Sequence, residues 1–242
     1  MITIEIAGLP VGLETEAPYI LRQCAPFVTD AAPIFTVRAS TEEIAAEQAL
    51  VPCQPAMAEF VCLYRAIAER LPDCERFVLH GATIQMDGKA YIFTAKSGTG
   101  KSTHISLWRQ RYGDAVRIVN GDKPIIWKQN GVWLACGTPW CGKEGLTSTD
   151  CVPVAGLCLL ERAAGNSIRP ATSKELAETI FHQIYRPKNA KRLLCFLTLL
   201  DEFLTAIPIW RMGCNMDIQA AETAHDAMLS RAGDQTAGSR QP

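Results

Sequence analysis

The chain is 242 residues long, 48% of its residues are hydrophobic and 20% are charged, and its formal net charge is −1. This composition excludes a disordered or fibrous protein, and the length suffices to bury a sizeable core in one large domain or in one domain with a small appendage. The small net charge excludes a general attraction to nucleic acid or to an anionic membrane, so we expect neither as a partner.

The N-terminal segment, residues 1–55, is expected to be rich in strands and to pack on the core. Residues 1–6 alternate between apolar and polar side chains as in a strand, and they lack the basic-then-apolar pattern of a secretory signal. A second strand is predicted at 34–38, and Ser40 favours a short helix after it. Without a signal, we expect the chain to keep its N-terminus and to be cytoplasmic.

A second, larger domain is predicted for residues 56–230. It begins with a helical pattern at 55–71 and continues with strand patterns at 77–79, 82–85 and 90–94. The further predicted elements are a helix at 103–112, strands at 116–119, 124–128, 132–135 and 153–161, helices at 173–184 and 189–206, a strand at 209–214 and a helix at 218–229. Strands and helices in this mixture predict an α/β fold with a mixed sheet.

Three further features bear on the class of protein. The apolar stretch at 193–207 contains Asp201 and Glu202 and is too short for a bilayer, which requires about 20 apolar residues, so it is predicted to be a packed helix. Residues 231–242 have the composition of a flexible tail. None of the ten cysteines forms a C-x-x-C pair, so we expect reduced thiols rather than disulfides or a zinc site.

The segment from Ala95 to Ser102 matches the Walker A phosphate loop, except that alanine stands in the place of the first glycine. Gly98 and Gly100 allow backbone conformations that turn successive N–H groups inward, and the following helix adds the positive end of its dipole. Lys101 is predicted to contact the β and γ phosphates, and the Ser102 hydroxyl to coordinate Mg²⁺. We therefore expect ATP to bind at Ser97, Gly98, Thr99, Gly100, Lys101, Ser102 and Thr103.

The strand predicted at 116–119 leads into Asn120, Gly121 and Asp122, about twenty residues past the loop. Magnesium is usually held by one or two carboxylates together with substrate phosphates, so Asp122 is a candidate metal ligand. A turn that only closes the strand is the alternative. His80 follows the strand predicted at 77–79, and a single histidine is more often a packed or surface residue than a ligand.

The stretch of about forty-five residues from Leu79 to Asp122 resembles the nucleotide-binding core shared by HPr kinase/phosphorylase and ATP-dependent phosphoenolpyruvate carboxykinase. In both families a histidine lies about fifteen residues before a loop of the form x-x-Ser-Gly-x-Gly-Lys-Ser/Thr, and a strand ending in acidic residues follows. His80, the segment 97–102 and Asp122 occupy those places here. The segment 137–144 is also similar to that of small bacterial relatives of the HPr kinase group. The resemblance implies a carboxykinase-like nucleotide-binding fold with C-terminal helices.

By this resemblance His80 belongs at the metal or the transferring phosphate, and Asp122 at the metal. One departure concerns the general base. The kinase family has two adjacent aspartates, the first resembling a general base, where this sequence has Gly121 followed by Asp122. Either Asp122 performs both roles, or His80 or Glu144 accepts the proton.

The glycine-containing segment 137–145 carries a Lys143-Glu144 pair. It would close over the phosphates, with Lys143 neutralising charge in the transition state, or it is a surface loop with an ordinary ion pair. Arg162 and Arg186 are candidates for binding the nucleotide or the acceptor, or for pairing with local acids.

Together these features predict that residues 56–230 form a kinase-like nucleotide-binding domain with a phosphate loop, which uses ATP and Mg²⁺ to phosphorylate a hydroxyl on a protein, peptide or small-molecule acceptor. The predicted catalytic residues are His80, Lys101, Asp122 and Lys143, with Ser102 and Asp122 at the metal. Two alternatives remain. One is an ATP-binding sensor or scaffold without transfer activity, which Gly121 favours, and the other is a carboxykinase-type reaction on oxaloacetate, for which the chain is short. The sequence does not indicate the acceptor, and it is compatible with a homo-oligomer.

Overall fold

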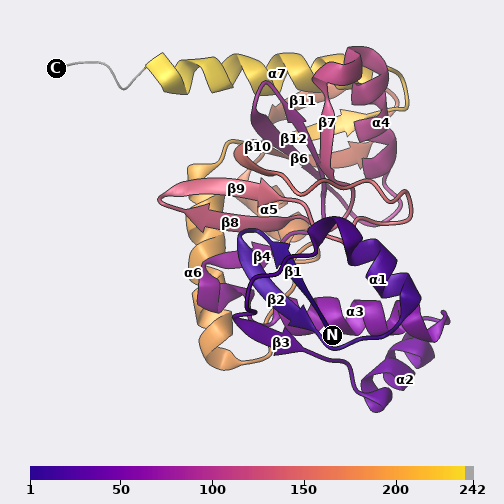
Figure 1. Ribbon diagram of the computed structural model, residues 1–242. Helices are drawn as coiled ribbons and strands as arrows, with labels where there is room; N and C mark the ends of the chain where they lie inside the picture. The colour runs from indigo at the N-terminus through magenta and orange to yellow at the C-terminus, as the bar shows by residue number, and fades with distance from the viewer. Residues whose placement is uncertain (238–242) are drawn as a thin grey trace.

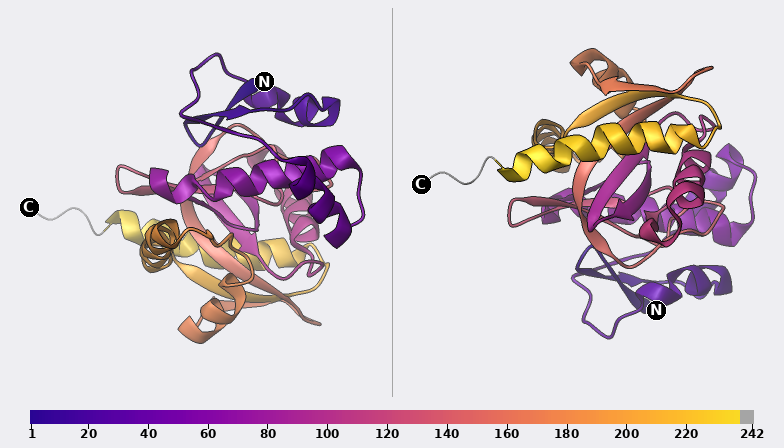
Figure 2. Two further views of the ribbon diagram at one scale, coloured as in Figure 1. Left: turned by 90° about the horizontal axis from the view of Figure 1, so that it is seen from below. Right: turned by 90° about the horizontal axis from the view of Figure 1, so that it is seen from above.

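The computed structural model describes residues 1–237, with side chains described through residue 229. Its N-terminal part is a three-stranded sheet, in which β2 lies between an antiparallel β1 and a parallel β3. The strands are β1 (Ile2–Ile6), β2 (Leu9–Leu13) and β3 (Phe35–Val37). In both views of Figure 2 this small sheet lies apart from the larger sheet of the molecule.

Three helices accompany the small sheet: α1 (Pro18–Cys24), α2 (Thr41–Leu50) and α3 (Pro55–Ala68). Apolar side chains of this part share one core with residues of the larger sheet and its loops. The core includes Ile4, Val11 and Leu63 from the N-terminal part and Ile125 and Trp140 from the rest of the chain. The segment 1–55 therefore packs on the rest of the chain through buried apolar area. The boundary at residue 55 itself stays a prediction.

The larger sheet has nine strands, in the order β4-β8-β9-β10-β6-β5-β7, with β12 added to β10 and β11 added to β12. β10 runs parallel to β6 and β12, and the other pairs are antiparallel. The predicted α/β fold with a mixed sheet is therefore confirmed. The strands are β4 (Arg76–Val78), β5 (Ala82–Met86), β6 (Lys89–Thr94), β7 (Arg117–Asn120), β8 (Ile125–Gln129), β9 (Val132–Cys136), β10 (Cys151–Arg162), β11 (Ser167–Pro170) and β12 (Ile209–Cys214).

Helices cover both faces of this sheet (Figure 1). On one face, α4 and α7 share a core with Tyr91 and Phe93 of β6, and on the other face α5 and α6 share a core with Ala90 and Ile92. Alternate residues of a strand point to opposite faces, so burial of both faces accounts for the almost unbroken apolar run of β6. The helices are α4 (Lys101–Tyr112), α5 (Ser173–Ile180), α6 (Ala190–Ala206) and α7 (Gln219–Ala237), with short 3₁₀ turns at Ala25–Phe27, Leu71–Cys74 and Gly113–Ala115.

Most predicted elements are present, but β2, α1 and β11 were not predicted. Pro10 lies close to the start of β2 and Pro18 opens α1, positions where proline is accepted. The helix predicted at 173–184 ends at Ile180. The stretch 193–207 is mostly α6, and none of the helices in residues 1–237 is long and apolar enough to cross a membrane. The tail predicted at 231–242 overlaps the end of α7, and 238–242 lie outside the described residues.

The expectation that all cysteines are reduced thiols is wrong. Cys136 ends β9 and Cys151 begins β10, and the two lie opposite each other in the antiparallel pair. Their Cα atoms are 4.1 Å apart and a disulfide joins them. Because the pair is separated by 15 residues and forms through strand register, no spacing motif indicates it. The other eight cysteines are free.

Candidate active site

The predicted phosphate loop joins the end of β6 to the start of α4. Gly98 and Gly100 have φ values of +78° and +117°, in the backbone region that favours glycine. A Cβ at Gly98 would meet no atom within 4 Å, so the loop is open on this side. Gly100 is the N-cap of α4, and no side chain caps this end of the helix. The first N–H groups of α4, with the positive end of its dipole, therefore face the loop.

Lys101 lies against the base of the loop. Its side chain is buried, and Nζ donates a hydrogen bond to the Ala95 carbonyl oxygen at 3.1 Å. Burial lowers the pKa of Lys101, and the negative charge of Asp122 acts in the opposite direction. Ala95 does not adopt a positive φ, so alanine in the place of the first glycine causes no strain.

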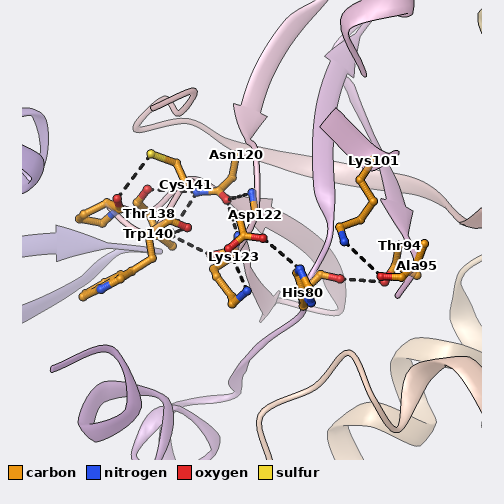
Figure 3. Close-up of polar contacts among 11 residues, drawn as sticks. His80, Thr94, Ala95, Lys101, Asn120, Asp122, Lys123, Thr138, Trp140 and Cys141 are labelled. Atoms are coloured by element: carbon orange, nitrogen blue, oxygen red, sulfur yellow. Dashed lines mark hydrogen bonds and ion pairs between the residues drawn. The ribbon is translucent and has the colours of Figure 1, made fainter. Parts of the chain in front are cut away.

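Asp122 lies between His80 and Lys123 (Figure 3). His80 Nε2 is 3.0 Å from Asp122 Oδ1, and Lys123 Nζ donates to Oδ2 at 2.8 Å. Burial is the largest influence on the pKa of Asp122 and acts to raise it. The hydrogen bond with His80 and the charge of Lys123 together outweigh burial and lower the pKa to about 2. Asp122 is therefore an ionised carboxylate at neutral pH.

The backbone holds His80 and Asp122 together. The Gly81 N–H donates to the Asp122 carbonyl at 2.9 Å, and the Thr94 hydroxyl donates to the His80 carbonyl at 2.7 Å. These bonds join the end of β6 to the residues that follow β4 and β7. Three segments distant in the sequence thus fix one another's position beside the phosphate loop.

Asn120 is a supporting residue that the sequence did not single out. Its side chain is fully buried, and its Nδ2 donates to the carbonyl and the hydroxyl of Thr138 at 3.0 and 3.1 Å. Its Oδ1 accepts the backbone N–H groups of Asp122 and Lys123 at 2.9 and 2.6 Å. This is an Asx turn, for which Asn before Gly-Asp is an available signal. Asn120 therefore sets the direction in which Asp122 leaves β7.

Gly121, where the resembled kinase family has its first aspartate, is closely covered by backbone. Its N–H donates to the Leu146 carbonyl at 2.9 Å. A Cβ placed on Gly121 would lie 2.7 Å from the Cys141 carbonyl oxygen and 3.3 Å from that of Leu146. A side chain at 121 would therefore collide with the loop that follows β9. The absent acid is a consequence of how this loop packs.

The phosphate loop, His80, Gly121 and Asp122 line a cavity of about 510 Å³, here called the phosphate-loop cavity. Glu144, one of the alternative bases, also lines it, whereas Thr99 and Arg186 do not. Arg162 lies behind the loop and donates to the carbonyls of Gly98 and Thr99 at 2.5 and 3.4 Å. The structure thus brings together nearly all predicted site residues, namely His80, Ser97, Gly98, Gly100, Lys101, Ser102, Thr103, Asp122 and Lys143.

A second cavity, of about 620 Å³, adjoins the first. We call it the aromatic cavity, because Tyr19, Phe60, Tyr64 and Trp140 contribute to its walls. Asp122, Gly142 and Lys143 line both cavities. No sequence pattern connects these aromatic residues, since they lie on α1, on α3 and in the loop after β9.

The residues of the phosphate-loop cavity fit a magnesium ion that arrives with a nucleotide. Ser102 and Asp122 both line it. Each Asp122 oxygen accepts one hydrogen bond and retains a further lone pair for a cation. Among the described residues, no group of three or more His, Cys, Asp or Glu side chains is arranged to hold a metal ion. A cation at Ser102 and Asp122 would therefore take most of its ligands from phosphate oxygens and water.

Resemblance to known proteins is weak. No family model matches the chain, and no curated protein matches it. Among solved structures, the Hpr(Ser) kinase/phosphatase from Coxiella burnetii matches with a TM-score of 0.38 and 10% sequence identity, over 66% of this chain and 95% of that one. Similarity at this level says nothing about the reaction. A functional proposal for this chain therefore has to be argued from the geometry of its own residues.

Proposed function

We propose that this chain is an ATP- and Mg²⁺-dependent kinase that transfers the γ-phosphoryl group to a hydroxyl of a protein, peptide or small-molecule acceptor. The observation that carries the proposal is the phosphate-loop cavity, where the N-terminus of α4, Lys101 and Asp122 face one space. Amides and a lysine attract phosphate oxygens, whereas an ionised carboxylate repels them unless a cation lies between. The combination therefore favours a nucleotide with its metal over a free anion.

The transfer forms two bonds and breaks two. The acceptor oxygen bonds to the γ-phosphorus, the bond from that phosphorus to the β,γ-bridging oxygen breaks so that ADP leaves, and the proton of the acceptor hydroxyl passes to Asp122. In the proposed site the loop amides and Lys101 hold the β and γ phosphates and offset the charge that develops on the leaving group. Lys143 lines the same cavity and would supply a second positive charge. Bound Mg²⁺, held by Ser102 and Asp122, would neutralise phosphate oxygens.

Position favours Asp122 as the group that orients the acceptor hydroxyl. Asp122 lines both cavities, whereas His80 and Glu144 line only the phosphate-loop cavity. A carboxylate with a pKa of about 2 is a weak base, but in a loose transition state the proton leaves the acceptor late. His80 then acts mainly through its contact with Asp122, so His80→Gln should reduce turnover less than Asp122→Asn does.

The direct test is incubation with γ-labelled ATP, Mg²⁺ and either a protein extract or a metabolite pool. A labelled product should form, and Lys101→Ala should reduce its rate by about 10²–10³-fold. Lys174→Ala is a matched control, because Lys174 is 86% exposed on α5 and away from the cavity. Removing Mg²⁺ with a chelator should abolish labelling. No labelled acceptor in either pool would overturn the proposal.

An ATP-binding sensor without transfer is the second candidate, and the closely packed Gly121 favours it, because no acid can stand beside Asp122. This function predicts ATP binding measurable by calorimetry, no labelled acceptor, and ATP affinity unchanged in Asp122→Asn. The kinase predicts that Asp122→Asn weakens binding of ATP with Mg²⁺. Conversion of oxaloacetate and ATP to phosphoenolpyruvate would instead indicate the carboxykinase-type reaction.

A further inference from the structure

The aromatic cavity lies beside the cavity in which the γ-phosphate is proposed to bind. It is a separate volume of about 620 Å³ that meets the phosphate-loop cavity at Asp122, Gly142 and Lys143. A volume of this size is typical of sites for small molecules or for a few residues of a peptide. A ligand in it would therefore present one end to the proposed position of the γ-phosphate.

The aromatic wall is preformed by contacts among its own members. The rings of Phe60 and Trp140 stack with centroids 5.1 Å apart, and Tyr19 meets Phe60 edge-on at 5.8 Å. The ring centroids of Tyr64 and Trp140 are also 5.8 Å apart. The Trp140 indole N–H donates to the Phe60 carbonyl at 2.9 Å, which ties the loop after β9 to α3. Because these rings are already held in place, binding against them costs little side-chain entropy.

One face of α3 completes the wall with apolar side chains. Met57 and Val61 are four residues apart on α3 and line the cavity together with Tyr64. Met57 is 44% exposed, a large fraction for a methionine in the first turn of a helix. The cavity thus combines exposed apolar surface with three lining residues, Asp122, Gly142 and Lys143, that it shares with a strongly polar site.

The charges at the walls are compensated within the protein. Arg65 forms an ion pair with Glu47, and Lys123 forms one with Asp122. Lys143 lies at the junction with the phosphate-loop cavity, where phosphate oxygens would face it. Away from the junction the lining is mostly apolar and aromatic, Gln23 adds a neutral amide, and the charge of Arg65 is paired with Glu47. A charged ligand group would lose its hydration there without compensation.

We propose that the aromatic cavity is the acceptor site and that it selects an uncharged acceptor whose hydroxyl neighbours an aromatic or apolar group. Such a hydroxyl can belong to a serine in a short apolar peptide or to a small alcohol. The proposal rests on the kinase function proposed above. It also gives the N-terminal segment a role, because α1 contributes Tyr19 and Gln23 to the site.

The test compares acceptors of opposite chemistry with ATP and Mg²⁺ in excess. The peptide pair is Ac-Phe-Ser-Leu-NH₂ and Ac-Asp-Ser-Glu-NH₂, and the alcohol pair is 2-phenylethanol and glycerol. Within at least one pair, the apolar member should have a kcat/KM roughly tenfold or more above that of the polar member, because the cavity cannot solvate charge or additional hydroxyls. The pair that shows this difference in kcat/KM identifies whether the acceptor is a peptide or a small alcohol. Equal use of both members in both pairs would overturn the proposal.

Met57→Glu tests the location of the site. Glutamate near the start of α3 is favourable to the helix, so this variant should fold. It should raise the KM for the apolar acceptor roughly tenfold and leave the KM for ATP within about twofold. Met216→Glu is the matched control, because Met216 is 80% exposed and lies outside both cavities. Equal effects of the two variants on the acceptor KM would refute the assignment.

Calorimetry separates this inference from the kinase function. If ATP binds and none of the four probes is phosphorylated, titration with Ac-Phe-Ser-Leu-NH₂ and with 2-phenylethanol decides about the cavity alone. Binding of either probe that Met57→Glu weakens and Met216→Glu preserves supports the cavity as a site for apolar hydroxyl compounds. Absence of binding by both probes overturns the inference, whatever the outcome of the labelling experiment.

Discussion

The two adjoining cavities differ in what forms their walls. The phosphate-loop cavity is made mostly of backbone amides, small residues and charged side chains, and half of its lining comes from one continuous segment, 97–103. The aromatic cavity is made of large side chains from α1, α3 and the loop after β9. Phosphate is the same group in every nucleotide, so a short local motif suffices to bind it. Acceptors differ among kinases, so the proposed acceptor site requires side chains assembled by tertiary contacts.

The loop after β9 belongs to both cavities, and Asp122 lies where they meet. A change that displaces the loop should weaken binding of both substrates, whereas a side-chain change elsewhere should weaken binding of only one. The following variants test this division in decreasing order of expected effect.

Asp122→Asn should cause the largest loss, about 10²–10³-fold in kcat for every acceptor, because it removes the proposed metal ligand and the charge beside the acceptor hydroxyl. Asparagine has nearly the same shape, so binding of an apolar peptide, measured by calorimetry without ATP, should change less than about twofold. Asp30→Asn, on the surface of the N-terminal segment, is the control. A normal kcat in Asp122→Asn would place the chemistry elsewhere.

Breaking the disulfide between Cys136 and Cys151 should lower the free energy of unfolding by about 3 kcal/mol, since the bond closes a loop of roughly 15 residues. This loop supplies Gly142 and Lys143 to both cavities, so KM should rise for ATP and acceptor together. Denaturant titration with and without reductant measures the stability. Cys151→Ser should be insensitive to reductant, while Cys195→Ser, which alters a free thiol, should respond like wild type. Ten free thiols by mass spectrometry without reductant would contradict the bond.

Asn120→Ala should reduce the free energy of unfolding by about 1–3 kcal/mol, because buried backbone groups of Thr138, Asp122 and Lys123 lose their partner. Urea denaturation measures this loss, with the exposed Gln129→Ala as the control. The variant should also lower kcat, because Asp122 would no longer be held in one direction. An unchanged kcat in the folded variant would show that Asp122 is positioned by other contacts.

Arg162→Ala should have the smallest effect and touch one cavity only. Its guanidinium donates to the carbonyls of Gly98 and Thr99 from an exposed position, so we expect a rise of about two- to fivefold in the KM for ATP. The KM for the acceptor should not change, because Arg162 does not line the aromatic cavity. Initial rates with each substrate varied in turn measure the two constants. An equal rise in both would mean that the cavities are coupled through the phosphate loop.

The division between the cavities also explains what the sequence could predict. The segment 97–103 was recognisable because its residues are adjacent and each has a local conformational role. His80 was brought to Asp122 only by resemblance to other families, since a lone histidine carries no signal. Tyr19, Phe60 and Trp140 could not be connected, because only the packing of the N-terminal segment makes them neighbours.

The fold shows the same limit. The apolar patterns of β6 and α6 predict both elements with few errors, because these patterns follow directly from burial, whereas α4 is expected from its place after the phosphate loop. The sequence does not indicate β2 and α1, because Pro10 and Pro18 are typical of connections, although proline is compatible with the start of either element. The disulfide depends on strand register, which one strand alone does not specify.

The close packing at Gly121 has a consequence for redesign. A single substitution, Gly121→Asp, would give this chain the paired aspartates of the resembled kinase family, but its Cβ would lie 2.7 Å from the Cys141 carbonyl oxygen. The new carboxylate would also lie beside two carbonyl oxygens, with which it cannot form hydrogen bonds. An active-site transplant would therefore have to rebuild the length or path of residues 141–146 together with position 121. Neither Gly121 nor this loop can therefore be redesigned without the other.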